Sequence, residues 1–163
     1  MTETRGERVQ RAKDSALRLL AVRARSRSEL SNRLRRKGFD EETVETVLDA
    51  LSAVDLVDDT GFARAWADER ARLKPVGPAR LRHELYQKGI DREIVERTLD
   101  EMYSDGRETE LARAAIDRKV ARATPGRADR VKLMRFLLGR GFSREVAARV
   151  INDIPENEED EAA

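Results

Sequence analysis

The chain has 163 residues, of which 40% are charged, 39% are hydrophobic and only 4% are aromatic. Few aromatic residues and many Ala, Leu, Arg and Glu favour an all-helical protein over a sheet protein. The absence of cysteine excludes disulfides, thiolate catalysis and cysteine-bound metals. No run approaches the ~18 apolar residues that span a membrane, and the polar start lacks the apolar core of a signal peptide. We therefore expect a cytoplasmic protein with no membrane partner.

The net charge of +1 conceals a segregation of the two signs. Residues 1–39 hold twelve Lys or Arg and four Asp or Glu, whereas residues 152–163 hold six acids and no base. We expect a flexible segment at residues 1–12 and a disordered acidic tail at residues 155–163. Such a tail either keeps the protein in solution or competes with nucleic acid for the basic body.

The first helical repeat is predicted at residues 13–57. The apolar residues of "AKDSALRLLAVRA" recur at helical spacing and predict a first helix. Ser26 and Glu29 then form a Ser-x-x-Glu capping box, which opens a second helix that Gly38 ends. A third helix follows, with apolar residues six and ten positions after that glycine.

A tight corner joins the second and third helices of this repeat. Gly38 suits the left-handed conformation that closes a helix, where a Cβ would cost free energy. The next residue, Phe39, can contact Leu34 of the preceding turn and Val44 of the following helix. Asp40 is an N-cap residue type that satisfies free N–H groups at the helix start. The corner is therefore interpreted as structural.

Two further repeats are predicted, at residues 58–106 and 107–154. The first helix of the second repeat follows Asp58 and stops before Pro75, and Pro78 begins the next helix. Its predicted inner face is Phe62, Ala65, Trp66 and Leu73. The corner recurs at Leu85, Gly89, Ile90 and Asp91, and again at Leu137, Gly141, Phe142 and Ser143. Agreement at several aligned positions in three copies indicates an internal repeat.

Each of these units is too small to bury an adequate core alone, so the units should pack on their neighbours. The predicted fold is all-α, with nine helices in three tandem three-helix repeats packed in an elongated, curved row.

The second helix of each repeat is basic and is the candidate binding surface for an acidic partner. Its candidate residues are Arg33, Arg35, Arg36 and Lys37; Arg80, Arg82 and Lys88; and Arg127, Arg130, Lys132 and Arg135. A row of such helices would attract phosphate backbones or an acidic protein groove. Basic residues near a helix C-terminus are also favoured by the helix dipole alone, which is the structural alternative.

The sequence carries no catalytic signature. It has no glycine-rich phosphate loop, no His-x-x-x-His pair and no cysteine. The one histidine, His83, lies in a basic helix without an evident partner for acid–base work. We expect no enzyme, no cofactor and no bound metal.

Three segments in this order, "RSRSELSNRLRRKGF", "LVDDTGFARAWADER" and "GPARLRHELYQKGI", resemble the RecX family of regulatory proteins. The matching residues are Ser26, Glu29, Leu30, Lys37 and Gly38; Asp58, Asp59, Phe62 and Ala63; and Gly77, Glu84, Leu85, Lys88 and Gly89. The resemblance is specific over residues 14–102. The third repeat has Arg140 where the motif has lysine, so that repeat is assigned from the internal repetition.

The resemblance implies tandem three-helix repeats that bind the RecA recombinase filament in its helical groove. It further implies inhibition of ATP hydrolysis and strand exchange, and so modulation of DNA repair and homologous recombination. We expect the chain to act as a monomer.

The alternative is a protein that binds single- or double-stranded DNA directly, because a helix, a corner and a basic helix resemble a helix-turn-helix unit. The helix after the corner, where a recognition helix would lie, is acidic in the first two repeats, and acidic side chains there would repel phosphates. The filament regulator is therefore the leading hypothesis.

Overall fold

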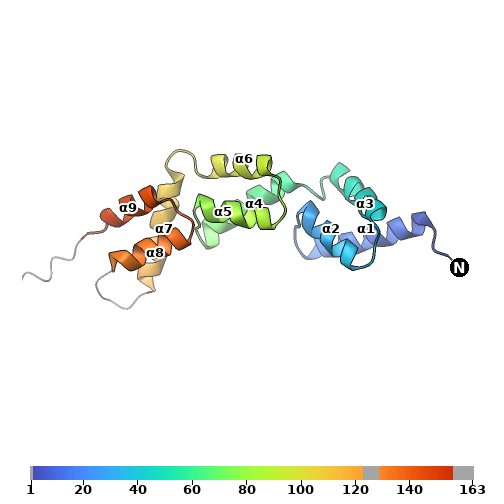
Figure 1. The fold of residues 1–163 in the computed structure, drawn as a ribbon, viewed down its shortest axis with the longest axis horizontal. Helices are drawn as coiled ribbons and strands as arrows, with labels where there is room; N and C mark the ends of the chain where they lie inside the picture. The colour runs from blue at the N-terminus through green and yellow to red at the C-terminus, as the bar shows by residue number, and fades with distance from the viewer. Residues whose placement is uncertain (1, 123–128, 156–163) are drawn as a thin grey trace, which may run out of the picture. The chain divides into compact units, whose positions relative to one another are not determined.

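The structure, a computed structural model, describes residues 2–122 and 129–155. Within these residues it contains nine α-helices and no strands (Figure 1). The helices are α1 Arg5–Val22, α2 Arg27–Arg36, α3 Glu41–Ala53, α4 Asp59–Leu73, α5 Pro78–Gln87, α6 Arg92–Met102, α7 Arg107–Ala121, α8 Arg130–Gly139 and α9 Arg144–Asn152. The all-α class is confirmed.

The first helix begins earlier than predicted, at Arg5, so most of the segment expected to be flexible through residue 12 is helical. A second capping box explains this start. The Thr4 hydroxyl accepts a hydrogen bond from the backbone N–H of Glu7 at 3.2 Å, and the Glu7 carboxylate accepts one from the backbone N–H of Thr4 at 2.8 Å. On the adjoining turns, Glu3 pairs with Arg11 at 2.8 Å. Local caps and charge pairs therefore hold a polar first turn that the apolar pattern does not reveal.

Helices α1, α2 and α3 enclose one apolar core, and Figure 1 shows them side by side. Leu30, Leu34 and Leu48 have no solvent exposure, and Ala12 and Ala16 let α1 approach closely. Complete burial of each leucine contributes about 1.5–3 kcal/mol to folding. This core holds α2, and with it the first set of candidate basic residues, in one orientation.

The corner after α2 is a Schellman ending. Gly38 adopts φ +92°, its N–H donates to the carbonyl of Arg35 at 2.9 Å, and the N–H of Phe39 donates to the carbonyl of Leu34 at 3.3 Å. The Asp40 carboxylate then caps α3 by accepting from the N–H of Thr43 at 3.0 Å. These bonds satisfy the carbonyls of Leu34 and Arg35 at the end of α2 and the N–H of Thr43 at the start of α3.

The other two corners repeat this geometry. Gly89 adopts φ +72° and Gly141 adopts φ +86°. The N–H of Ile90 donates to the carbonyl of Leu85 at 3.1 Å, and that of Phe142 to the carbonyl of Leu137 at 3.2 Å. One apolar residue therefore follows the glycine and bonds back over it at each of the three corners.

The third corner also lies directly against the start of α5. The N–H of Gly77 donates to the carbonyl of Arg140 at 2.8 Å, and the N–H of Ala79 donates to the carbonyl of Gly141 at 3.2 Å. A Cβ on Gly141 would collide with the backbone of Arg80, and one on Gly77 would collide with the backbone of Phe142. Glycine at both positions permits this backbone contact.

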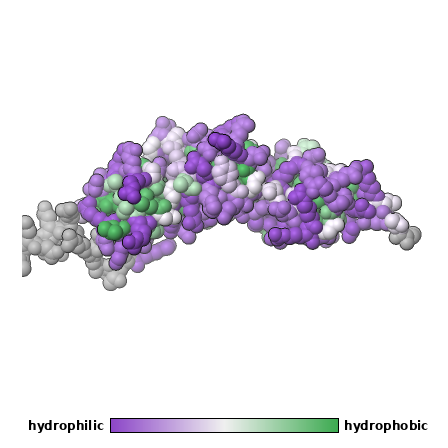
Figure 2. Space-filling view, viewed as in Figure 1, coloured by the Kyte–Doolittle hydropathy of each residue, from purple (hydrophilic) through white to green (hydrophobic). Residues whose placement is uncertain are grey.

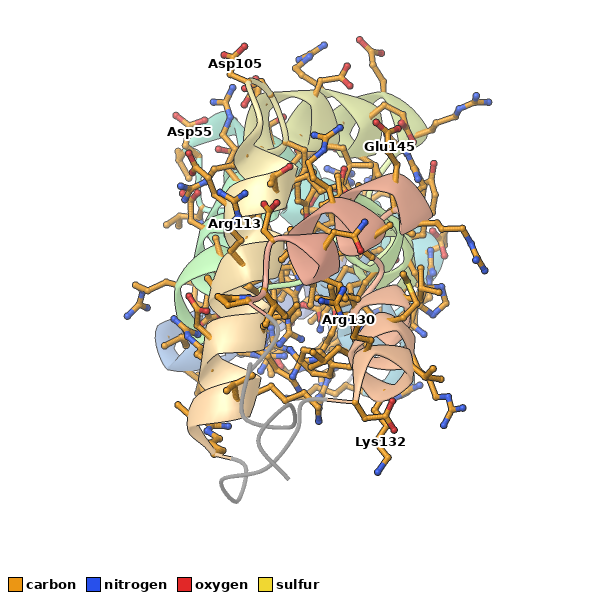
Figure 3. The ribbon with its side chains drawn as sticks, turned by 90° about the vertical axis from the view of Figure 1, so that its left-hand side faces the viewer. Asp55, Asp105, Arg113, Arg130, Lys132 and Glu145 are labelled. Atoms are coloured by element: carbon orange, nitrogen blue, oxygen red, sulfur yellow. The ribbon has the colours of Figure 1, made fainter. Side chains whose placement is uncertain are left out.

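Two aspartates adopt left-handed backbone conformations in exposed turns (Figure 3). Asp55 has φ +57° in the turn after α3, and Asp105 has φ +52° in the turn after α6. Aspartate tolerates this conformation better than most residues, because its short polar side chain can bond locally.

The described residues divide into two compact units. One comprises residues 1–65 with 85–95, and the other comprises residues 66–84 with 96–163. The division passes through α4, α5 and α6, so each unit completes its packing with part of the middle repeat. Three-helix units of this size need such neighbours to bury enough apolar surface.

The second unit has its core between α7, α8 and α9. Leu137 and Ala147 are fully buried there, and Leu111 and Ile116 of α7 pack in the same cluster. Tyr103, packed against this core, donates its hydroxyl to the carbonyl of Val76 at 2.8 Å. Arg113 and Asp153 form an ion pair between the first and last elements of the repeat.

The predicted inner face of α4 is only partly correct. Phe62 is buried and Trp66 is half-buried, but Ala65 is exposed and Leu73 is 59% exposed. The small residues Ala63 and Ala67 occupy the buried face instead.

None of the helices in the described part of the chain is long and apolar enough to cross a membrane.

Candidate partner-binding surfaces

The basic residues of α2 divide into paired and unpaired side chains. The Arg35 guanidinium binds both carboxylate oxygens of Glu41, at 2.8 and 2.6 Å, and this pairing raises the pKa of Arg35. Lys37 donates its ammonium to the hydroxyl of Ser15 at 2.8 Å. Arg33 and Arg36 are exposed and form no ion pair with any residue in 2–122 or 129–155. Two of these four candidates, Arg33 and Arg36, are therefore available to a partner.

Arg82 and Lys88 of the second candidate set are held by carboxylates. Arg82 binds both oxygens of Glu96, at 2.9 and 3.1 Å. Lys88 donates to the Glu29 carboxylate at 2.9 Å, and its own carbonyl accepts from the Ser26 hydroxyl at 2.6 Å. These two side chains stabilise the fold.

Arg80 shares the buried carboxylate of Glu84 with two other donors. Glu84 is 8% exposed and accepts hydrogen bonds from the indole N–H of Trp66 at 3.0 Å, from Arg70 at 2.9 Å and from Arg80 at 3.2 Å. Burial alone would raise the pKa of Glu84, but the hydrogen bonds from Trp66 and Arg80 and the charge of Arg70 hold it below its ordinary value. A buried carboxylate with three donors is fully satisfied.

The candidates of α8 are more exposed. Arg130 donates to the Asn152 side chain at 3.5 Å and to the carbonyl of Ile154 at 3.4 Å. Lys132 extends away from the ribbon in Figure 3, with Asp129 at 3.9 Å. Arg135 is exposed and has no ion pair with the described part of the chain. Arg127 lies outside the described residues.

The first unit carries a basic pocket of about 160 Å³ at the end of α1 and along α2. We call it the arginine pocket; its lining residues are Arg23, Arg25, Glu29, Asn32, Arg33 and Arg36. Arg25 is only 8% exposed, and its Nε donates to the carbonyl of Leu19 at 3.3 Å. Burial, together with the charges of Arg23 and Arg33, lowers the pKa of Arg25. Like charges are thus held close together here.

The second unit carries a larger basic surface, formed by two adjoining grooves of about 320 and 290 Å³ that share Lys74, Phe136 and Arg140. We call it the Arg140 surface; its cations are Arg70, Lys74, Arg80, Arg118, Lys119, Arg122, Arg135 and Arg140. Among the described residues lining the two grooves, the one carboxylate is Glu84. Burial, and then the charges of Arg80 and Arg70, lower the pKa of Arg140.

Local contacts fix the cations of the Arg140 surface. Arg118 donates to the carbonyls of Leu73 and Arg72, both at 2.8 Å, and so caps the C-terminus of α4. Lys119 and Arg140 lie 4.7 and 4.9 Å from the centre of the Phe136 ring, within the range of cation–π attraction.

Sequence reasoning missed several residues of these two surfaces. Arg23 and Arg25 follow α1, Lys74 follows α4, Lys119 lies in the last turn of α7 and Arg122 follows it, whereas the predicted residues belong to second helices only. The available signal was the cluster of basic residues at the ends of first helices. Folding brings those ends beside the second helices.

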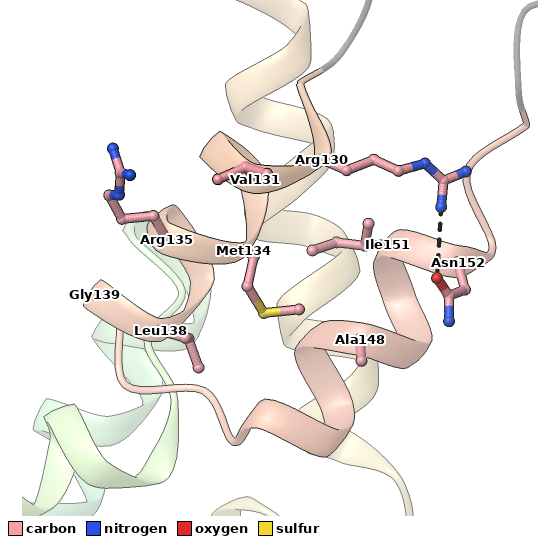
Figure 4. Close-up of a pocket in the computed structure, with 9 residues that line it drawn as sticks. All are labelled: Arg130, Val131, Met134, Arg135, Leu138, Gly139, Ala148, Ile151 and Asn152. Atoms are coloured by element: carbon pink, nitrogen blue, oxygen red, sulfur yellow. Dashed lines mark hydrogen bonds between the residues drawn. The ribbon is translucent and has the colours of Figure 1, made fainter.

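An apolar groove of about 730 Å³ lies between α8 and α9 and was not predicted (Figure 4). Its floor includes Met134, Leu138 and Ile151, while Arg130 lies on the rim. Val131 beside it is 66% exposed. Figure 2 shows hydrophobic residues gathered on the surface over these helices, amid a largely hydrophilic face.

Metal ligands do not gather in the described ranges: no group of three His, Cys, Asp or Glu side chains is placed to hold an ion.

Comparison with known families accounts for all three repeats. Residues 12–51 match the first three-helix domain of RecX, residues 58–99 match the second, and residues 107–151 match the third. The chain belongs to the RecX family. The arginine pocket draws all six of its lining residues from the first RecX domain, and the Arg140 surface combines residues of the second and third.

Several curated proteins named Regulatory protein RecX are similar to this chain. The one from Chlorobaculum tepidum is 39% identical and covers 86% of each chain, and the one from Chlorobium limicola is 40% identical over 89% of this chain and 92% of its own. The one from Amycolatopsis mediterranei is 36% identical over 90% and 85%. These names support a regulatory role for this RecX-family chain.

Solved RecX structures share the fold. The crystal structure of RecX from Lactobacillus salivarius aligns with a TM-score of 0.77 at 22% identity, over 91% of this chain and 97% of that one.

Proposed function

We propose that this RecX-family protein binds the RecA–DNA filament, in its helical groove, and inhibits ATP hydrolysis and strand exchange. The family membership and the regulatory names of the relatives support this role. The structural observation that carries it is the separation of the basic residues into paired and unpaired sets. Most cations of the arginine pocket in one unit and of the Arg140 surface in the other have no carboxylate partner among the described residues; the exceptions are Arg23, Arg70 and Arg80.

A chain with two basic surfaces is suited to a partner that presents equivalent acidic sites repeatedly along an axis. Each surface offers modest charge attraction, and linkage through the chain makes the second contact intramolecular once the first has formed. A filament presents many equivalent protomers and a continuous phosphate backbone. Long-range attraction would also speed the encounter, an effect that salt weakens.

The ion pairs within the fold indicate which basic residues are available for these contacts. Within the fold, Arg35 forms an ion pair with Glu41, Arg82 with Glu96, and Lys88 with Glu29. Recruiting them to a partner would break those pairs. We therefore assign the filament contacts to Arg33, Arg36 and those cations of the Arg140 surface that have no carboxylate partner among the described residues, which excludes Arg70 and Arg80.

The test is the DNA-dependent ATPase of the cognate RecA, measured with and without the full chain at substoichiometric concentration. Filament binding predicts a clear fall in the hydrolysis rate that weakens as salt rises. An unchanged rate, together with tight binding of the chain to bare DNA, would overturn the proposal.

Direct nucleic-acid binding is the second candidate, and the Arg140 surface favours it. Eight cations there line two grooves with a single carboxylate among the described lining residues, a composition that phosphate backbones match. Direct reading of DNA by α3 is disfavoured, because Glu41 and Glu42 in its first turn would repel phosphates. Binding of an isolated duplex or single strand without RecA, at physiological salt, would support this candidate.

A further inference from the structure

We infer that the arginine pocket is a binding site for a single phosphate group. The inference does not depend on the proposed action on RecA. It rests on a buried cation without a carboxylate partner, on a neighbouring acid that is already satisfied, and on the size of the pocket.

The buried cation is Arg25. Its side chain is more than nine-tenths covered, yet its one described hydrogen bond runs from Nε to the carbonyl of Leu19 at 3.3 Å. Within residues 2–122 and 129–155 this guanidinium has no carboxylate partner, and Arg25 is one of the residues that line the pocket. Its two terminal nitrogens make no described hydrogen bond and remain open to solvent, so they can donate to an anion that enters the pocket.

The acid in the pocket does not neutralise this charge. Glu29 accepts from Lys88 at 2.9 Å, from Arg23 at 3.2 and 3.3 Å, and from the backbone N–H of Ser26 at 3.3 Å. Burial alone would raise the pKa of Glu29, but Lys88 and Arg23 hold it below its ordinary value. Its charge is therefore matched by Lys88 and Arg23, which leaves Arg25, Arg33 and Arg36 without compensation.

The pocket has the dimensions and the donors for one tetrahedral anion. Its volume of about 160 Å³ is well above the ~10–15 Å³ that a cavity needs to hold one water. Arg33 and Arg36 stand three residues apart on one face of α2, and Asn32 adds an amide donor.

Three unmatched guanidiniums favour phosphate over carboxylate. A carboxylate carries one charge on two oxygens and is satisfied by one arginine fork. A phosphate monoester carries about −1.5 to −2 charges and three acceptor oxygens, which several arginines can share. Free phosphate and the terminal phosphate of a nucleic-acid strand share this chemistry.

The test is a titration of the ¹⁵N-labelled full chain with inorganic phosphate at constant ionic strength, followed by NMR at the Arg25 Nε–H and the Asn32 amide. Phosphate binding predicts saturable shifts of both signals that sodium chloride does not produce. Arg25 itself is buried, so the variants are made at its exposed neighbours. The double variant Arg33→Gln/Arg36→Gln should bind at least about tenfold more weakly, a change of about 1.4 kcal/mol.

Arg35→Gln is the matched control, because Arg35 lies on the same helix but pairs with Glu41 outside the pocket. It should bind phosphate like the parent. A second arm replaces phosphate with a short oligothymidylate that carries a 5′-phosphate. The same shifts from this oligonucleotide, displaced by phosphate, assign the terminal phosphate of a strand as the source, and shifts from inorganic phosphate alone assign a free phosphate.

Three results would overturn the inference: shifts no larger than those of chloride, equal affinity in the double variant and the control, or shifts from polyglutamate but not from phosphate. RecA is absent from every sample, so a failure here leaves the proposed filament function untouched, and the reverse also holds.

Discussion

Lys88 donates to the carboxylate of Glu29 at 2.9 Å across 59 residues of sequence. Glu29 belongs to the capping box that opens α2, and Lys88 lies beside the corner that follows α5. The Ser26 hydroxyl, from the same capping box, donates to the Lys88 carbonyl at 2.6 Å. One helix start of the first RecX domain is thus bonded to the corner of the second.

This relationship predicts the effect of Lys88→Met. Both side chains are less than a quarter exposed, at 24% and 18%, so the pair is screened less than a surface pair. Loss of the ammonium leaves Glu29 with Arg23 and should lower the free energy of unfolding by about 1–2 kcal/mol. Urea denaturation followed by circular dichroism measures it. The control Lys132→Met, whose side chain is 76% exposed, should change the free energy by less than about 0.5 kcal/mol. An equal effect in both variants would contradict the buried-pair account.

The corner glycines are expected to differ in their tolerance of alanine. Gly38 and Gly141 both have positive φ, but a Cβ on Gly38 meets no atom within 4 Å, whereas one on Gly141 would strike the backbone of Arg80. Gly38→Ala should cost about 1–2 kcal/mol for the left-handed conformation alone. Gly141→Ala should cost about 1–3 kcal/mol more, because the contact with α5 must open. The midpoint of urea denaturation, compared between the two variants, tests this order. Equal midpoints would show that the contact between the Gly141 corner and α5 does not contribute to stability.

The N-cap of α3 predicts a pH dependence. The backbone N–H of Thr43, and then its hydroxyl, lower the pKa of Asp40 from 3.8 to about 2. A carboxyl group whose pKa falls on folding stabilises the fold above its unfolded pKa, and this contribution disappears as the pH falls through the folded value. The stability difference between the parent and Asp40→Asn should therefore change between pH 3.8 and about 2 and stay constant above pH 5. Thermal melts of both proteins across this range give the measurement. Parallel curves throughout would contradict the assignment.

The corners could be predicted from sequence because their causes are local. Gly38, Phe39 and Asp40 act on backbone groups within a few residues, and the same is true of Gly89 and Gly141. Three copies of one pattern removed the ambiguity that a single glycine would leave. The start of α1 was not predicted, because Thr4 and Glu7 cap a turn that has few apolar residues to indicate a helix.

The candidate site could be predicted only in outline. A sequence shows that α2 and α5 are basic, but not that Arg82 meets Glu96 fourteen residues later or that Lys88 meets Glu29 fifty-nine residues earlier. These pairings arise from tertiary packing. The Arg140 surface likewise combines ends and faces of α4, α5, α7 and α8, which no single segment displays. Arg127 and the acidic tail lie outside the described residues, and their proposed roles stay predictions.

We propose that unpaired arginines, and not basic second helices as such, inhibit the RecA filament. The decisive measurement is the concentration of this chain that halves the DNA-dependent ATPase of RecA, compared between two matched double variants. Arg33→Gln/Arg36→Gln removes two unpaired charges, and Arg35→Gln/Arg82→Gln removes two paired ones. The account predicts that the first variant requires an about tenfold higher concentration, and that the second stays within about threefold of the parent. Equal losses in both variants, or full inhibition by the first, would contradict it.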